Sequence, residues 1–152
     1  MLNQPRPAVA IAILYRQGQL LLQLRDNIPG ILYPGCWGLF GGHLEPEESP
    51  EDAMYRELLE EIHYRPPHLT FFDFYSDDHV IRHVFHAPLT VEMASLRLSE
   101  GWDMGLFSLE DIQRGDRYSE RAEQVRPIGS PHQKLLLDFF ETHRSLIAQL
   151  TE

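Results

Sequence analysis

Residues 41–62 read GGHLEPEESPEDAMYRELLEEI, and this stretch carries the most specific pattern in the chain. Glu57, Glu60 and Glu61 stand at i, i+3 and i+4 of a predicted helix, a spacing that places the three carboxylates on one helical face. Each repulsion between them costs about 0.2–0.5 kcal/mol. Arg56 can orient one carboxylate from the side but cannot neutralise three. We therefore expect a divalent metal ion with oxygen ligands, Mg²⁺ in the first place.

The start of this helix is also readable from the sequence. Ser49 is the expected N-cap and Pro50 fits the first helical position. Acidic residues follow in the first turn, where the helix dipole favours negative charge. The stripe expected to pack on the core recurs every four residues and consists of Met54, Leu58 and Ile62, with Ala53 and Leu59 beside them. Packing of this stripe therefore fixes the helix to the core and, with it, the position of the acidic face.

The spacing of the whole stretch is specific: Gly42, five residues, Glu48, seven residues, then Arg56-Glu57-Leu58-Leu59-Glu60-Glu61. It resembles the signature of the Nudix hydrolases through Glu61. It departs from that signature where the family usually has a glycine and an aliphatic residue, because this chain has His63-Tyr64. We expect His63 to adopt the left-handed conformation that ends the helix. A solvated acidic face is the ordinary explanation of a charge run, but it does not account for Gly42 and Glu48 in register.

The resemblance implies a set of metal ligands. Nudix enzymes hold their metal ions with the glutamates that match Glu57, Glu60 and Glu61, helped by a backbone carbonyl at the position of Gly41. One of these glutamates, or another acidic group nearby, acts as general base. We favour Glu57, oriented by Arg56. Mg²⁺ is the expected cofactor, with Mn²⁺ as a substitute.

Two further glutamates belong to the predicted site. Glu48 is expected to hold its own loop or Arg56. Glu100-Gly101 resembles a downstream Glu-Gly of MutT-like members, which makes Glu100 the candidate for an additional metal-binding carboxylate, ahead of Glu92 and Asp103. An ordinary surface charge is the alternative for both glutamates.

Arg25 and Gly42 are the predicted substrate-binding residues. Arg25 resembles an arginine that contacts substrate phosphate in MutT-like members, and a strand-end surface charge is the alternative. Gly42 lacks a side chain, so its backbone can approach a ligand. The aromatic residues nearby either stack on a base or belong to the core; they are Tyr33, Trp37 and Phe40.

Hydrophobic periodicity gives the fold class. Strands are expected at residues 8–15, 20–25, 37–40, 69–75, 80–87 and 102–107, and helices at 50–62, 108–112 and from 130 onward. Residues 26–36 and 114–129 are predicted to be loops. Alanines alternate with bulky residues in 8–15, so another element should pack closely on the alanine face. This order indicates an α/β protein with a mixed sheet between helices, and the resemblance implies the α/β/α Nudix sandwich in a single domain, 1–152.

Composition excludes several classes of protein. Thirteen basic and twenty-three acidic residues give a formal net charge of −10. Lysine and arginine do not cluster, so a nucleic acid polymer is not expected as a partner. Cys36 is the single cysteine, which excludes an intrachain disulfide and favours a reducing compartment. No signal peptide or membrane span is recognised, and a cytoplasmic location is expected.

The resemblance predicts a Mg²⁺-dependent pyrophosphohydrolase. Its substrate would be a nucleoside triphosphate or a nucleoside diphosphate linked to a group X, in a MutT-like role that includes nucleotide-pool sanitising. The alternatives are a nucleotide-sugar or ADP-ribose hydrolase and a non-catalytic module that senses a nucleotide. The apolar side of the C-terminal helix leaves room for a homodimer; it comprises Leu135, Leu136, Phe139, Phe140, Leu146, Ile147 and Leu150.

Overall fold

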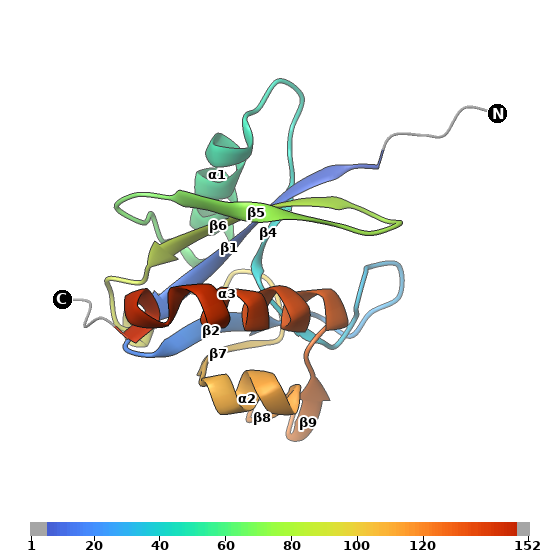
Figure 1. The fold of residues 1–152 in the computed structure, drawn as a ribbon. Coiled ribbons are helices and arrows are strands. Elements are labelled where there is room, and N and C mark those ends of the chain that lie inside the picture. Colours follow the sequence, from blue (N-terminus) through green and yellow to red (C-terminus); the bar gives the residue numbers. More distant parts are fainter. Residues whose placement is uncertain (1–5, 149–152) are drawn as a thin grey trace.

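The computed structural model describes residues 6–148, and a seven-stranded mixed sheet lies at its centre (Figure 1). The sheet has the order β3-β2-β1-β6-β5, while β4 also pairs with β1 and β7 with β2. Its strands are β1 (Ala8–Arg16), β2 (Gln19–Leu24), β3 (Trp37–Gly38), β4 (Phe40–His43), β5 (Thr70–Ser76), β6 (Ile81–Pro88) and β7 (Asp103–Phe107). β1 and β6 run parallel and the other pairs run antiparallel. The predicted α/β fold with a mixed sheet is confirmed.

Helices cover both faces of this sheet (Figure 1). On one face, Ala10 and Ala12 of β1 meet Met54 and Leu58 of α1 (Pro50–Ile62) in a buried cluster. The small alanines let the helix approach the sheet closely, as the alternation in β1 predicts. The opposite face is covered by α2 (Leu109–Arg114) and α3 (Ser130–Ala148), whose buried apolar residues form a second cluster with the bulky residues of β1.

The sheet divides where β1 and β2 separate. β1 pairs with β4 along its first half and with β2 only at its end, and both partners lie on the side of β1 away from β6. Leu39 joins β3, which pairs with β2, to β4, which pairs with β1. The predicted single strand 37–40 is therefore two short strands. Gly41 and Gly42 lie within the second strand and not after it, because β4 continues along β1 to His43.

The predicted loop 114–129 is wrong over most of its length. It contains an antiparallel hairpin of β8 (Asp116–Ser119) and β9 (Gln124–Pro127), which pair only with each other in the part of the chain that the structure describes. Its apolar residues Tyr118 and Val125 are 54% and 57% exposed. Because these apolar side chains are not buried, the two strands need no alternation of apolar and polar residues. The hairpin is recognised in the structure by its backbone pairing.

The apolar side of α3 packs within its own chain. Leu135, Leu136, Phe139, Phe140 and Ile147 are buried against the sheet, and Leu150 lies outside the described residues. These side chains are not available to a partner in this structure, so a homodimer stays a prediction without support from this helix. Within residues 6–148, no helix has the length and apolar character needed to cross a membrane.

Candidate active site

The boundaries of α1 agree with the sequence-based prediction. The Ser49 hydroxyl accepts a hydrogen bond from the Asp52 N–H at 3.1 Å, and Pro50 occupies the first turn. His63 ends the helix in the left-handed conformation, with φ 58°, and its N–H donates to the Leu59 carbonyl at 3.1 Å. These caps satisfy backbone groups at both ends. The helix is thereby fixed as a rigid support for its acidic side chains.

Arg56 connects the loop before α1 to the carboxylates on it. Its Nε and Nη2 donate to the two carboxylate oxygens of Glu48 at 2.7 and 2.9 Å. Nη2 also donates to the His43 carbonyl at 3.1 Å, while Nη1 donates to Glu57 at 2.9 Å and to Glu60 at 3.3 Å. Hydrogen bonding to Arg56 lowers the pKa of Glu48 to about 2. Glu48 therefore holds Arg56, and Arg56 holds Glu57.

Glu57 faces the glycine pair of β4. A Cβ added to Gly42 would lie 2.5 Å from the Glu57 carboxylate oxygen, so the glycine makes room for this side chain. Burial raises the pKa of Glu57, while the hydrogen bond from Arg56 lowers it. The neighbouring Glu60 and Glu100 raise it further by repulsion. Glu57 is thus an oriented, partly desolvated carboxylate, which is the form a general base requires.

Glu61 is the most buried of the α1 carboxylates, with 7% of its surface exposed. Burial raises its pKa to about 8, and repulsion from Glu57 and Glu100 adds to the shift. Hydrogen bonds to the Gly41 backbone and the Gln23 side chain act in the opposite direction. Among the described residues, its Oε2 atom is buried without a hydrogen-bond partner. A buried carboxylate among like charges is unstable in its ionised form unless a cation joins it.

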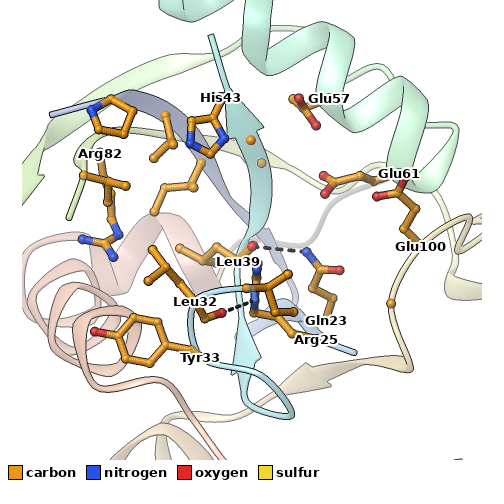
Figure 2. Close-up of a pocket in the computed structure, with 18 of the residues that line it drawn as sticks. Gln23, Arg25, Leu32, Tyr33, Leu39, His43, Glu57, Glu61, Arg82 and Glu100 are labelled. Atoms are coloured by element: carbon orange, nitrogen blue, oxygen red, sulfur yellow. Dashed lines mark hydrogen bonds between the residues drawn. The ribbon is translucent and has the colours of Figure 1, made fainter. Parts of the chain in front are cut away.

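Glu100 comes to the same place from the loop before β7. This loop is tied to the end of α1, because the Ser99 N–H donates to the Glu61 carbonyl at 2.8 Å and the Ser99 hydroxyl hydrogen-bonds His63 at 2.8 Å. Figure 2 shows Glu57, Glu61 and Glu100 on one side of β4. Of the three acidic candidates downstream of α1, Glu100 lines the cavity described below, whereas Glu92 and Asp103 do not.

A cavity of about 1030 Å³ opens at the division of the sheet. It is lined by residues from both faces of the sheet. Four predicted metal-binding residues line it, namely Gly41, Glu57, Glu61 and Glu100. So do the other predicted site residues Arg25, Gly42 and Arg56. Glu48 and Glu60 do not line it. The Glu60 side chain is 59% exposed and turns to Arg56. Its volume lies at the upper limit of the range for small-molecule sites, roughly 300–1000 Å³.

The donor set at this end of the cavity fits a divalent cation. Within residues 6–148, no three acidic, histidine or cysteine side chains already converge as a metal site. Three carboxylates nevertheless repel one another there, and Glu61 has a buried, unpaired oxygen. Carboxylates are the ligands that Mg²⁺ and Mn²⁺ prefer. On this chemistry Glu57, Glu61 and Glu100 would hold the ion, and Glu60 is the least well placed.

Other polar residues of the cavity were missed in the sequence. Arg82 of β6 is 4% exposed and donates through Nη1 to Asp77 at 2.8 Å. His132 of α3 accepts a hydrogen bond at Nδ1 from the Leu39 N–H at 2.9 Å. Both line the cavity, as does Gln23 of β2. For Gln23 and Arg82 the available signal was a polar residue inside an apolar strand pattern, LLLQL and IRHVF respectively. Arg25 is half-buried there, and its Nε donates to the Leu32 carbonyl at 2.8 Å.

His132 should make the protein sensitive to mild acid. Burial lowers its pKa from the ordinary 6.5 to about 3, so the folded state binds fewer protons than the unfolded state below about pH 6.5. The contribution of neutral His132 to the free energy of unfolding is present in full above about pH 6.5 and is lost as the pH falls toward 3. We expect His132→Asn, which keeps an acceptor for Leu39, to lose less stability between about pH 7 and about pH 5 than the wild type. Urea unfolding at both pH values measures this, and equal losses in the two proteins would contradict it.

Comparisons with known proteins show the family and the fold of the chain. Residues 4–127 match the family model of the NUDIX domain. RNA pyrophosphohydrolases of Proteus mirabilis and Photorhabdus laumondii are each 46% identical over 57 residues, which cover 38% of this chain and 29% of theirs. The match thus spans less than a third of these curated relatives.

Solved structures show the same fold. The NUDIX domain of Shewanella oneidensis NrtR, complexed with ADP ribose, superposes with a TM-score of 0.71 at 19% identity, over 92% of this chain and 90% of that one. A MutT protein from Methanosarcina mazei Go1 gives 0.70 at 22% identity, over 93% and 98%. A Francisella tularensis enzyme described as a bifunctional NMN adenylyltransferase/ADP ribose pyrophosphatase, complexed with AMP and a Mn ion, gives 0.65 at 21% identity, over 92% and 42%.

Proposed function

The chain belongs to the NUDIX domain family, and from this premise we propose that it is a pyrophosphohydrolase dependent on Mg²⁺ or Mn²⁺. It splits a phosphoanhydride bond in a nucleoside triphosphate or in a nucleoside diphosphate linked to a group X. The observation that carries this proposal is the gathering of Glu57, Glu61 and Glu100 at one end of a cavity large enough for a nucleotide.

The residues of the site divide the work of hydrolysis. When bound, the metal ion shields the phosphate charge and lowers the pKa of a water molecule. Glu57 accepts a proton from the attacking water, in an orientation set by its 2.9 Å hydrogen bond with Arg56. Arg25, which lines the same cavity, binds a phosphate oxygen. Gly41 lets β4 lie close against β1, and Gly42 leaves the space that the Glu57 carboxylate occupies.

The relatives suggest further substrates for the same chemistry. ADP ribose is bound by the NrtR domain, which favours a nucleoside diphosphate-X substrate or a nucleotide-sensing role. The name RNA pyrophosphohydrolase raises a triphosphate at the end of an RNA as a second candidate. The net charge of −10 argues against long RNA as a partner, so we favour small nucleotides. The single domain and the cytoplasmic location stay predictions.

Chelation should abolish turnover. We expect phosphate or pyrophosphate release from the preferred substrate to stop in EDTA and to return with excess Mg²⁺ or Mn²⁺, because the carboxylates need a cation to bind phosphate oxygens. The panel comprises nucleoside triphosphates, nucleotide sugars, ADP-ribose, dinucleoside polyphosphates and a short RNA with a 5′-triphosphate. Release that persists in EDTA would contradict the metal requirement. Nucleotide binding without turnover across the whole panel would favour the sensing module.

A further inference from the structure

The cavity has a second end that the hydrolytic residues do not occupy. Val9, Ile11 and Leu39 line it from the sheet face that α3 covers. Figure 2 shows Arg82 on the side of β4 opposite Glu57, Glu61 and Glu100. A nucleotide with its phosphates at the carboxylates would therefore extend its base toward Arg82, between apolar walls that suit a planar ring.

Arg82 is a fixed hydrogen-bond donor at this end. Its Nη1 is paired with Asp77 at 2.8 Å, and Asp77 in turn accepts hydrogen bonds from the backbone N–H groups of His79 and Val80. The guanidinium is therefore held in the turn before β6 and does not need to be ordered by a ligand. Its remaining N–H groups can only donate, because a guanidinium carries no acceptor.

His132 is a second fixed donor. Its Nδ1 accepts the hydrogen bond from the Leu39 N–H at 2.9 Å, so in the neutral ring the proton lies on Nε2. The ring is buried, and burial lowers its pKa to about 3, which keeps it neutral at physiological pH. His132 lines the cavity, and Nε2–H is the ring group left for a ligand.

These two side chains offer donors without a net positive charge of their own, because Asp77 neutralises Arg82 and His132 is uncharged. The other cation that acts on His132 is Arg25, which the proposed function assigns to a substrate phosphate. Such a surface is poorly suited to a second phosphate, which needs positive charge to offset its desolvation. It is well suited to a neutral acceptor such as a ring carbonyl. Arginine reads guanine in nucleic acids through the carbonyl and the adjacent ring nitrogen by the same donor-to-acceptor pairing.

We propose that Arg82 and His132 form a base-recognition subsite that selects bases with a ring carbonyl over bases with an amino group at the same position. Hypoxanthine and guanine would be accepted, and adenine would be rejected. An amino group would meet donors that it cannot satisfy, and a buried polar group left unpaired is costly. This inference rests on the proposed function only in placing the phosphates at the carboxylates.

Equilibrium binding of IMP and AMP tests the subsite without turnover. The two nucleotides differ at the position in question, where IMP has a carbonyl and AMP an amino group. We expect IMP to bind at least about tenfold more tightly in isothermal titration calorimetry. Equal affinities, tighter AMP binding, or no binding of either nucleotide would overturn the proposal. If the substrate panel shows no hydrolysis while IMP is still preferred, the proposed function fails and the subsite stands.

Matched variants separate recognition from folding. His132→Asn keeps an acceptor for the Leu39 N–H but removes the donor at the Nε2 position, so IMP affinity should fall about tenfold and AMP affinity should change little. His132→Gln keeps a donor near the Nε2 position and should retain the preference for IMP. Arg82→Lys keeps the charge that pairs with Asp77 but loses the planar fork, and should also reduce the preference. Equal losses for both nucleotides in His132→Asn would show a structural role only and would overturn the proposal.

Discussion

Replacing Glu57 or Glu61 by glutamine is expected to lower kcat for phosphoanhydride hydrolysis by about 10²–10⁴-fold. Glu57 is the proposed base, and Glu61 is the proposed metal ligand with a buried, unpaired oxygen. Glutamine has nearly the same shape but carries no charge, so it is too weak a base to take the proton and a much weaker ligand for a divalent cation. The loss should come without loss of stability, since burial and repulsion already raise the pKa of both carboxylates. Product release in saturating substrate and urea unfolding measure the two effects.

Glu60→Gln is the matched control on the same helix. Glu60 is 59% exposed and does not line the cavity, so its replacement should reduce kcat far less than either of the other two. A larger loss in Glu60→Gln than in Glu61→Gln would contradict the placement of the metal ion on Glu57, Glu61 and Glu100. It would instead support the original expectation that Glu60 is a principal ligand.

The second large effect is expected at the glycine pair, where adjacent substitutions should act on different properties. Gly41 has φ 150°, and a Cβ there would lie 1.9 Å from the Ala10 carbonyl oxygen in the backbone of β1. This strand lies in the middle of the sheet and cannot yield. Gly41→Ala should therefore destabilise the fold by about 3 kcal/mol or more, measured by urea unfolding.

Gly42→Ala should instead spare the fold and damage activity. Its Cβ would meet the end of the Glu57 side chain at 2.5 Å, and this side chain can turn away at small cost in free energy. Turning away breaks its 2.9 Å hydrogen bond with Arg56, so kcat should fall while the urea midpoint stays near that of the wild type. Normal activity in Gly42→Ala would show that the position of Glu57 is not critical.

Local signals made α1 and β1 predictable from the sequence. The N-cap at Ser49, Pro50 and the left-handed His63 all act within a few residues of themselves, and the structure has each of them. The alternation of alanines in β1 likewise gave the close packing of the helix. Such features depend on propensity and periodicity, which a single sequence contains.

The different burial of the three glutamates could also have been derived. At about 100° per residue, Glu61 lies about 60° from the core-facing Leu58, Glu57 about 100° and Glu60 about 160°. The prediction that all three carboxylates share one helical face does not distinguish their burial. The angle to Leu58 separates a buried carboxylate from an exposed one, and the structure follows this order.

Long-range contacts were beyond such reasoning. His132 reaches Leu39 across a separation of 93 residues, and its role depends on how α3 lies over the divided sheet. The hairpin of β8 and β9 was not predicted for a different reason. Among the described residues its strands pair only with each other and bury no apolar face. Neither feature leaves a period in the sequence.

Binding of Mn²⁺, followed by electron paramagnetic resonance, tests most directly whether the carboxylates gather around a cation. The wild type should bind Mn²⁺, and Glu61→Gln and Glu100→Gln should each weaken the binding at least about tenfold, because each removes one charged ligand. Glu60→Gln should bind nearly as the wild type does. Unchanged Mn²⁺ affinity in Glu61→Gln and Glu100→Gln would contradict the assignment of this end of the cavity as the metal site.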